Sequence, residues 1–238
     1  MSITTRLVEV RTKILKANDV TARWLRQHFQ ECGVCVVSLV SSPGTGKTLL
    51  LEQTLRALRE RYRVAALVGD LATENDARRL ARANVPVRQI ATGTVCHLEA
   101  EMVRQALDGW NLHEIDFLFI ENVGNLVCPA TYDLGEHLRA VLFSVTEGED
   151  KPLKYPTIFN TADVAIITKM DLAEVVEFDL TAARQSVESV RPGMPILEVS
   201  AKRGDGMQQW LELLSTRRQA ALRPDTEQAS VQQSAELG

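Results

Sequence analysis

The sequence predicts an α/β fold, a doubly wound and mostly parallel β-sheet. Apolar, β-branched runs alternate with amphipathic stretches along most of the 238 residues, which is the order of strands and helices in such folds. The runs lack the polar alternation of a half-exposed strand, as expected where helices cover both faces of a sheet. After the first run, a glycine-rich stretch leads directly into a leucine-rich helical pattern. Together these three observations favour one large α/β domain.

Three regions follow from this pattern. Residues 1–30 are predicted to form a helical extension of two amphipathic pieces, interrupted near Asn18 and Asp19. Residues 31–222 form the α/β domain. Residues 223–238 are polar and lack periodicity, so they are predicted to be a disordered tail.

Within the α/β domain, six buried strands and four helices are expected in alternation. The strands are predicted at 34–40, 64–69, 117–122, 140–145, 164–169 and 196–200. The helices are predicted at 49–59, 75–83, 98–107 and 206–214. Each strand runs into the next helix, as in a chain that winds repeatedly across a parallel sheet.

Composition excludes several classes of protein. A hydrophobic content of 45% is enough to build a packed core. The net charge of -4 argues against a protein that binds nucleic acid by neutralising phosphates. The chain has no signal-like start and no apolar run near the ~20 residues of a membrane helix, so we expect a cytoplasmic protein without membrane partners. Four cysteines are too few for a disulfide framework in a chain of this length.

The glycine-rich stretch "SSPGTGKT", residues 41–48, matches the phosphate-binding P-loop pattern except that Ser41 replaces its first glycine. Glycines let the backbone curl so that N–H groups face an anion, and the following helix adds its positive end. Lys47 is expected to reach the β and γ phosphates, and the Thr48 hydroxyl to coordinate Mg²⁺. The predicted nucleotide-binding residues of the loop are Ser42, Gly44, Thr45, Gly46, Lys47, Thr48 and Leu49.

Two further segments favour a GTPase over an ATPase. "TKMD" follows a buried run and resembles the guanine-binding N-K-x-D motif, with Asp171 expected to accept hydrogen bonds from the guanine ring. About thirty residues later, "SAK" resembles the loop that supports the guanine O6. The predicted base-binding residues are Thr168, Lys169, Asp171, Ser200, Ala201 and Lys202.

Acidic residues at strand ends supply candidates for Mg²⁺ binding and catalysis. Glu121 and Gly124 form an E-x-x-G that resembles the γ-phosphate switch, with Glu in place of Asp. Asp70 ends a strand and is expected to bind Mg²⁺ or water, whereas Asp76 either joins the catalytic site or complements a helix N-terminus. The predicted catalytic residues are thus Lys47, Asp70, Asp76 and Glu121, and the predicted Mg²⁺ ligands are Thr48, Asp70 and Glu121.

A second group of residues suggests a transition-metal site. Cys96 and His97 stand side by side before a helix, and Cys128 lies four residues beyond the glycine of the presumed switch. Two thiolates and an imidazole suit Zn²⁺ or Ni²⁺. The alternative is that the cysteines are small buried residues and the histidine caps the helix. The position of Cys128 favours metal, because movement of a phosphate-sensing loop would displace a ligand.

These segments together resemble the HypB-like GTPases, a SIMIBI-class family that delivers nickel during [NiFe] hydrogenase maturation. The resemblance covers residues 16–215 and includes "SSPGTGKT", "CHLEAEMV", "ENVGNLVCPA" and "TKMDL". It implies a P-loop GTPase fold for residues 31–222, with GTP and Mg²⁺ as cofactors, and a homodimer that forms with GTP. It also implies Ni²⁺ or Zn²⁺ bound by Cys96, His97 and Cys128 at the dimer interface. The implied partners are a HypA-like zinc and nickel accessory protein and the hydrogenase large-subunit precursor.

Some residues depart from the family's pattern. Certain members carry an N-terminal C-x-x-C-G-C or histidine-rich nickel site, whereas this chain has only four histidines and begins without that motif. Cys32 and Cys35 form a C-x-x-C, but the second lies in a predicted buried strand, which disfavours metal binding. Three histidines without a motif are expected to be surface or local structural residues: His28, His113 and His137.

Three alternative functions stay open. A urease-type nickel GTPase would carry Cys-Pro-His, but here Cys128 and Pro129 are followed by Ala130. A P-loop kinase would not need the two base-binding segments or the Cys-His-Cys group. A non-catalytic metal reservoir would bind nickel without responding to nucleotide.

Overall fold

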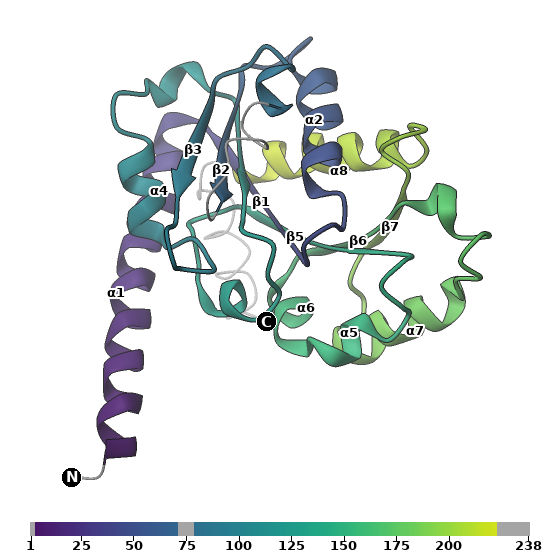
Figure 1. Ribbon diagram of the computed structural model, residues 1–238. Helices are drawn as coiled ribbons and strands as arrows, with labels where there is room; N and C mark the ends of the chain where they lie inside the picture. The colour runs from purple at the N-terminus through teal and green to yellow at the C-terminus, as the bar shows by residue number, and fades with distance from the viewer. Residues whose placement is uncertain (1–2, 71–78, 223–238) are drawn as a thin grey trace, which may run out of the picture.

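The computed structural model describes residues 3–70 and 79–222 and confirms the doubly wound α/β fold. Its sheet has the strand order β3-β2-β4-β1-β5-β6-β7, and every neighbouring pair is parallel (Figure 1). The strands are β1 Cys35–Ser41, β2 Val64–Asp70, β3 Val87–Ala91, β4 Phe117–Glu121, β5 Leu138–Ser144, β6 Val164–Thr168 and β7 Ile196–Val199. The carboxyl ends of all seven strands therefore meet at one edge of the sheet.

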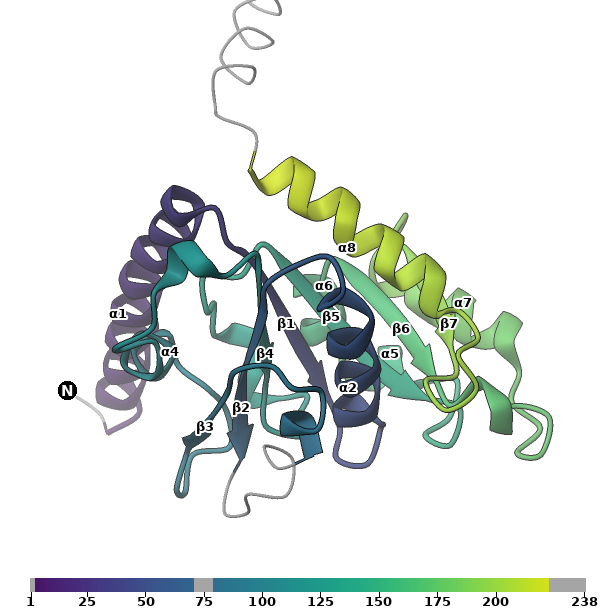
Figure 2. The same ribbon diagram turned by 90° about the horizontal axis from the view of Figure 1, so that it is seen from above.

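Helices cover both faces of the sheet. The α-helices are α1 Ile3–Cys32, α2 Lys47–Leu58, α4 Ala100–Ala106, α5 Lys151–Lys154, α6 Pro156–Thr161, α7 Leu180–Val190 and α8 Met207–Ala221. Short 3₁₀ helices are η1 Leu112–Glu114, η2 Cys128–Thr131 and η3 Met170–Leu172. α2 and α8 pack on one face, while α1, α4, α6 and α7 pack on the other (Figures 1 and 2). None of the described helices has the length and apolar character needed to cross a membrane.

The prediction of two N-terminal helical pieces is wrong, because α1 is a single 30-residue helix. Its amino-terminal half extends away from the sheet, and its carboxyl-terminal half lies beside α4 (Figure 1). Asn18 is buried in the middle of α1, where its Nδ2 donates to the Asp133 carbonyl at 2.8 Å and its Oδ1 accepts from the Ala100 N–H at 2.9 Å. The polar side chain thus joins α1 to the start of α4 and to the loop at Asp133, and it does not interrupt the helix.

The structure contains one strand that the sequence did not predict. β3 stands at the edge of the sheet and pairs only with β2. Ile90 is its only buried residue, so the segment "VRQIA" lacks the continuous apolar run of the central strands.

Helix boundaries also differ from the prediction. α7 and the short α5 and α6 were not predicted, α4 begins two residues late, and α8 continues to Ala221. Of the helix predicted at 75–83, residues 79–81 are helical and residues 75–78 lie outside the described residues, as does the tail predicted at 223–238.

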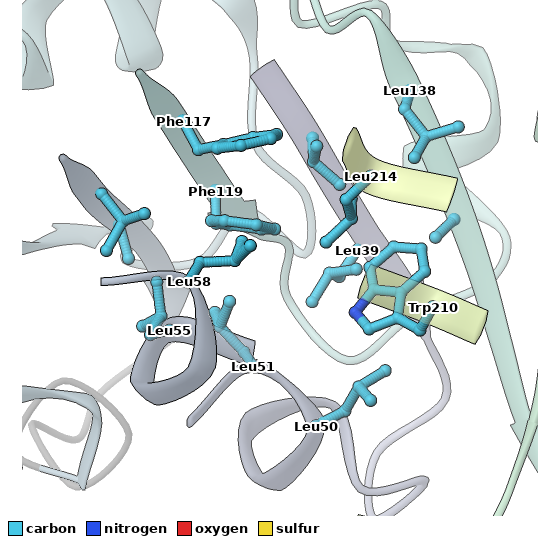
Figure 3. Close-up of a cluster of buried hydrophobic side chains, with 14 of the residues drawn as sticks. Leu39, Leu50, Leu51, Leu55, Leu58, Phe117, Phe119, Leu138, Trp210 and Leu214 are labelled. Atoms are coloured by element: carbon cyan, nitrogen blue, oxygen red, sulfur yellow. The ribbon is translucent and has the colours of Figure 1, made fainter. Parts of the chain in front are cut away.

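A buried cluster between the sheet and α2 fixes the start of the P-loop helix. Trp210 of α8 is fully buried against the leucines of α2, as Figure 3 shows. Its Nε1 donates to the Thr54 hydroxyl at 2.9 Å, and that hydroxyl donates to the Leu50 carbonyl at 2.7 Å. Because the indole N–H is satisfied, α8 holds α2 without burying an unpaired donor.

The buried imidazole of His137 links β1 to the segment before β5. The Val36 backbone N–H donates to the His137 ring nitrogen Nδ1 at 3.0 Å, and the His137 backbone N–H donates to the Val36 carbonyl at 2.8 Å. Burial, aided by the positive charge of Arg26, lowers the pKa of His137 to about 4. The folded protein therefore keeps this imidazole neutral at neutral pH.

This buried imidazole predicts a loss of stability in mild acid. The unfolded chain takes up the proton near the ordinary histidine pKa of about 6.5, whereas the folded protein does so only near the lowered value. Stability is therefore fully present above pH ~6.5 and falls as the pH approaches the folded pKa, by about 2 kcal/mol between pH ~7 and pH ~5. Urea unfolding at both pH values measures this, and His137→Gln, whose amide oxygen can still accept from Val36, should lose most of the difference. An equal difference in the variant would contradict the assignment.

Candidate nucleotide and metal site

The P-loop lies between β1 and α2 at the carboxyl edge of the sheet. Gly44 and Gly46 have φ angles of 74° and 100°, which only glycine adopts without strain. The turn brings Lys47 back over the loop, where its Nζ donates to the Ser41 hydroxyl at 3.0 Å. Ser41 replaces the first glycine of the pattern, and here its side chain contacts the lysine. A cavity of about 460 Å³ opens above the loop; its walls include Pro43, Gly44, Thr45, Gly46, Lys47, Thr48, Leu49, Arg79, Glu121, Val123 and Gly124.

Two of the three predicted Mg²⁺ ligands meet in this cavity. The Thr48 hydroxyl donates to Glu121 Oε1 at 2.7 Å, and the Glu121 carboxyl is 97% shielded from solvent. Hard oxygen donors of this kind, a hydroxyl and a carboxylate next to a phosphate site, suit Mg²⁺. Asp70 ends β2 two residues beyond Val68, which lies opposite Glu121 in the parallel register. The backbone register thus places Asp70 at the same edge, whereas Asp76 lies outside the described residues.

The two predicted base-binding segments also come together. Ser200 Oγ donates to Asp171 Oδ1 at 2.7 Å, which lowers the pKa of that carboxyl and favours its ionised form. The Thr168 hydroxyl donates to the Thr45 carbonyl at 2.7 Å and so ties the first segment to the P-loop. The TKMD and SAK segments thus lie side by side, and the first of them contacts the P-loop. Ala201 and Lys202 continue the second segment, with Lys202 exposed to solvent.

The E-x-x-G loop packs directly on the P-loop. A Cβ atom at Gly124 would lie 3.0 Å from the Pro43 Cα, so the two backbones approach too closely for a side chain. The loop then turns toward the Cys96 segment through two asparagines. Asn122 Oδ1 accepts from the Leu98 N–H at 3.1 Å, and Asn125 Nδ2 donates to the Cys96 carbonyl at 3.2 Å. The loop that borders the phosphate cavity is therefore hydrogen-bonded to the segment that carries the first cysteine.

Cys96, His97 and Cys128 converge on one point. One donor atom from each lies within 4.8 Å of the others, and the two sulfur atoms are 2.9 Å apart. The His97 side chain is 11% exposed, its Nε2 lies 3.4 Å from Glu99 Oε1, and its ring packs on Tyr132 with centroids 4.0 Å apart. Among the described residues, neither ring nitrogen of His97 makes a hydrogen bond, although both are buried. Two sulfurs beside an imidazole with an available nitrogen form a donor set that suits Zn²⁺ or Ni²⁺.

The alternative role of His97 as a helix cap does not agree with the structure. The backbone N–H groups at the start of α4 are taken by Asn122, which accepts from Leu98, and by Asn18, which accepts from Ala100. Neither cysteine of the group is fully buried. His97 therefore makes no capping hydrogen bond among the described residues, and both cysteines stay partly exposed.

The C-x-x-C formed by Cys32 and Cys35 is not a pair of ligands. Cys35 is fully buried in β1, and burial raises the pKa of its thiol to about 12. A thiol in that environment stays protonated and packs as a small apolar side chain. Cys32 ends α1 and lies near His28 and His113 instead.

Sequence reasoning missed two charged residues near the phosphate loop. Arg79 lines the cavity, and its Nε donates to Glu52 of α2 at 3.0 Å. Glu147 accepts from the Thr45 hydroxyl and from the Ser144 N–H, both at 2.8 Å. Although burial opposes its ionisation, these bonds and Lys151 keep the pKa of Glu147 below its ordinary value. Glu147 could have been found from the sequence, because it is an acidic residue that closely follows a buried strand. No local sequence pattern points to Arg79.

Comparison with known proteins agrees with this geometry. The family model described as "CobW/HypB/UreG, nucleotide-binding domain" matches residues 35–198. The hydrogenase maturation factor HypB of Azotobacter chroococcum mcd 1 is 44% identical over 218 residues, which is 92% of this chain and 72% of that protein. The hydrogenase/urease maturation factor HypB of Helicobacter hepaticus is 41% identical over 215 residues, which is 89% of this chain and 88% of that protein.

A solved structure has a similar fold. The crystal structure of HypB from Helicobacter pylori in complex with nickel has a TM-score of 0.82 and 39% sequence identity, and the match covers 87% of this chain and 98% of that one. The region that the family model matches spans the P-loop, the E-x-x-G loop and the TKMD segment, and it ends two residues before Ser200. On the strength of the family match, the sequence identity and the shared P-loop fold, the chain belongs to the HypB hydrogenase maturation factors of the CobW/HypB/UreG family.

Proposed function

We propose that this protein is a Mg²⁺-dependent GTPase that binds nickel or zinc and delivers nickel to the hydrogenase large-subunit precursor. The observation that carries the proposal is the hydrogen bond from Asn125 to the Cys96 carbonyl. It joins the loop beside the phosphate cavity to the Cys-His-Cys group, so a change at the nucleotide can alter the metal ligands. The nickel complex of the Helicobacter pylori relative supports nickel as the cargo.

Hydrolysis depends on groups that hold the phosphates and the attacking water. Lys47 and the P-loop N–H groups would bind the β and γ phosphates, and the Gly124 N–H would contact the γ phosphate. Thr48, Glu121 and Asp70 would hold Mg²⁺, which neutralises charge on the phosphates when bound. Water adds to the γ phosphorus, the bond to the β–γ bridging oxygen breaks, and GDP and phosphate leave. Asp76 is proposed to help position that water.

Nucleotide state controls the metal through the shared loop and the dimer. GTP closes a homodimer in which two Cys-His-Cys groups come together. Hydrolysis relaxes the loop that carries Gly124, Asn125 and Cys128, and the metal passes on. We propose a cytoplasmic protein that works with a HypA-like zinc and nickel accessory protein, and that turns over slowly until its partners are present, as switch GTPases without a supplied arginine do.

Base selection is tested by Asp171→Asn. The Asp171 carboxylate would accept two hydrogen bonds from guanine, whereas an amide accepts one and donates one. We expect affinity for GDP to fall about 10²-fold and affinity for xanthosine diphosphate to rise, because xanthine carries a carbonyl where guanine carries an amine. Fluorescence titration with both nucleotides measures the change, and Asp205→Asn in the same region is the control. Unchanged preference for guanine would contradict the assigned base site.

Delivery is tested with the full-length protein loaded with nickel. Transfer to an apo large-subunit precursor is measured after addition of GTP, of GDP or of a non-hydrolysable GTP analogue. We expect transfer with GTP, and none above background with Cys128→Ala. Val127→Ala replaces an exposed neighbour, which is 65% accessible, and should transfer normally. Equal transfer with every nucleotide would favour the metal reservoir, and transfer to a urease precursor alone would favour the urease client named for the Helicobacter hepaticus relative.

A further inference from the structure

Arg79 lines the phosphate cavity on the side of the E-x-x-G loop. It stands between β2 and β3 in the chain, and β2 pairs with β4, whose end carries Glu121 and leads to Gly124. The base-binding segments follow β6 and β7, which lie on the other side of β1 in the sheet. A nucleotide held by the P-loop after β1 would therefore lie with its base toward β6 and its last phosphate toward β4 and Arg79.

The backbone around Arg79 is anchored to the core, whereas its side chain is half-exposed. Residues 79–81 are helical and lie beside α2 (Figures 1 and 2). Leu80 and Ala83 are fully buried, and the Ala83 carbonyl accepts from Arg59 of α2 at 2.6 Å. The Arg79 side chain is 43% exposed, so it can change rotamer without moving this backbone.

An ion pair with Glu52 holds the Arg79 side chain at the cavity wall. Arg79 Nε donates to Glu52 Oε2 at 3.0 Å, and the two terminal nitrogens of the guanidinium make no hydrogen bond within the described residues. Those two nitrogens form the fork that binds two oxygens of one phosphate. Glu52 follows Thr48 by four residues on α2, so the two share one face of the helix about 6 Å apart along its axis. The guanidinium is thus about one helical turn from a proposed Mg²⁺ ligand.

Release of Arg79 would leave Glu52 paired with another cation. The Glu52 side chain is 8% exposed, and a carboxylate buried to that degree is costly without a partner. Its Oε1 lies 2.7 Å from an Arg56 nitrogen, and this ion pair does not depend on Arg79. Arg79 can therefore turn from Glu52 to a phosphate while the carboxylate stays paired.

We propose that Arg79 exchanges its ion pair with Glu52 for a contact with the γ phosphate of bound GTP, and so distinguishes GTP from GDP. This inference rests on the proposed GTPase function and adds a residue to its nucleotide site. GDP lacks the γ phosphate, so in the GDP state Arg79 stays on Glu52. Because the contact forms with GTP before hydrolysis, its loss weakens GTP binding without weakening GDP binding.

The test compares the affinities of full-length protein for GDP and for a non-hydrolysable GTP analogue, both with Mg²⁺. Displacement of a fluorescent GDP derivative measures the two affinities. Arg79→Ala should lower affinity for the analogue about ten- to hundredfold and leave affinity for GDP within about twofold. Arg79→Lys keeps the charge but not the fork, so it should recover part of the loss. Arg82→Ala removes an exposed arginine three residues away and should change neither affinity by more than about twofold.

Glu52→Gln tests the exchange of partners. This substitution removes the carboxylate that competes for Arg79, so affinity for the analogue should rise about two- to fivefold. In the double variant Glu52→Gln, Arg79→Ala this rise should vanish, because no guanidinium remains to be released. Far-ultraviolet circular dichroism and urea unfolding check that each variant is folded.

Three results would overturn the role of Arg79. The first is an unchanged ratio of analogue affinity to GDP affinity in folded Arg79→Ala. The second is a rise with Glu52→Gln that persists in the double variant. The third is a loss seen only at protein concentrations high enough for dimers to form, which titration at two protein concentrations detects. Native protein that binds neither nucleotide would instead contradict the proposed function, so the two failures can be told apart.

Discussion

Replacing Lys47 with alanine should lower the rate of GTP hydrolysis by about 10²–10³-fold at saturating nucleotide. The Lys47 side chain is almost entirely buried beside the phosphate cavity, and its Nζ donates to Ser41 at the base of the loop. It is the side-chain cation of the P-loop, and Arg79 pairs with Glu52 at the cavity wall. Loss of the ammonium therefore leaves charge on the transferred phosphoryl group with weaker stabilisation.

Phosphate release at several GTP concentrations measures this loss. Arg56→Ala removes a positive charge from the same helix, but its side chain is 44% exposed and pairs with Glu52. That control should hydrolyse GTP within about twofold of the native rate. Hydrolysis by Lys47→Ala within a few-fold of the native rate would contradict the assigned phosphate site.

Gly206→Ala should destabilise the protein by about 3–5 kcal/mol, a large part of the stability of an ordinary domain. Gly206 precedes α8 with a φ of 73°, and a Cβ atom there would lie 1.9 Å from the Glu198 carbonyl oxygen. An alanine must carry both the left-handed strain and the displacement of β7. The turn also carries the Ser200–Asp205 pairing that holds Ser200 against Asp171.

Gly204→Ala separates the cost of the left-handed backbone from the cost of the contact with Glu198. Gly204 also has a positive φ, 92°, but a Cβ atom there would meet nothing within 4 Å. We therefore expect a loss of about 1–2 kcal/mol for this control. Urea unfolding of the nucleotide-free proteins, followed by far-ultraviolet circular dichroism, measures both values. Equal losses at the two glycines would show that contact with Glu198 does not matter.

That the P-loop and the E-x-x-G loop meet could be predicted from the sequence, because both are short segments attached to strand ends. In a parallel sheet the carboxyl ends meet at one edge, so a P-loop after β1 and an E-x-x-G after β4 must come together. The Thr48–Glu121 contact follows from this rule. The Ser200–Asp171 contact follows as well, since β6 and β7 are neighbours.

Features that depend on distant parts of the chain could not be predicted in this way. Asn18 was read as a helix interruption because the groups that satisfy its side chain, at Ala100 and Asp133, lie more than 80 residues away in the sequence. β3 was missed because it is an edge strand in which only Ile90 is buried, so its sequence has no continuous apolar run. His113 approaches Cys32 across 81 residues, and the C-x-x-C that contains Cys32 gives no sign of this contact. Asn125 lies within the segment "ENVGNLVCPA", but its hydrogen bond to the Cys96 carbonyl depends on how two loops pack together.

On the proposed function, nucleotide state sets metal affinity through the loop from Gly124 to Cys128. Substitution of Asn125 by alanine removes the hydrogen bond to the Cys96 carbonyl but leaves Cys96, His97 and Cys128 in place. Asn160→Ala, at an exposed position on α6, is the matched control. Cys128→Ala removes a proposed ligand outright and should weaken binding in every nucleotide state.

The decisive measurement is nickel affinity by chelator competition in nucleotide-free, GDP-bound and GTP-analogue-bound protein. We predict that affinity differs between the GDP and GTP-analogue states by about 5- to 150-fold in the native protein and in Asn160→Ala. In Asn125→Ala the metal should still bind, but that difference should shrink to a few-fold. Nickel affinity that is the same in all three nucleotide states of the native protein would contradict the account.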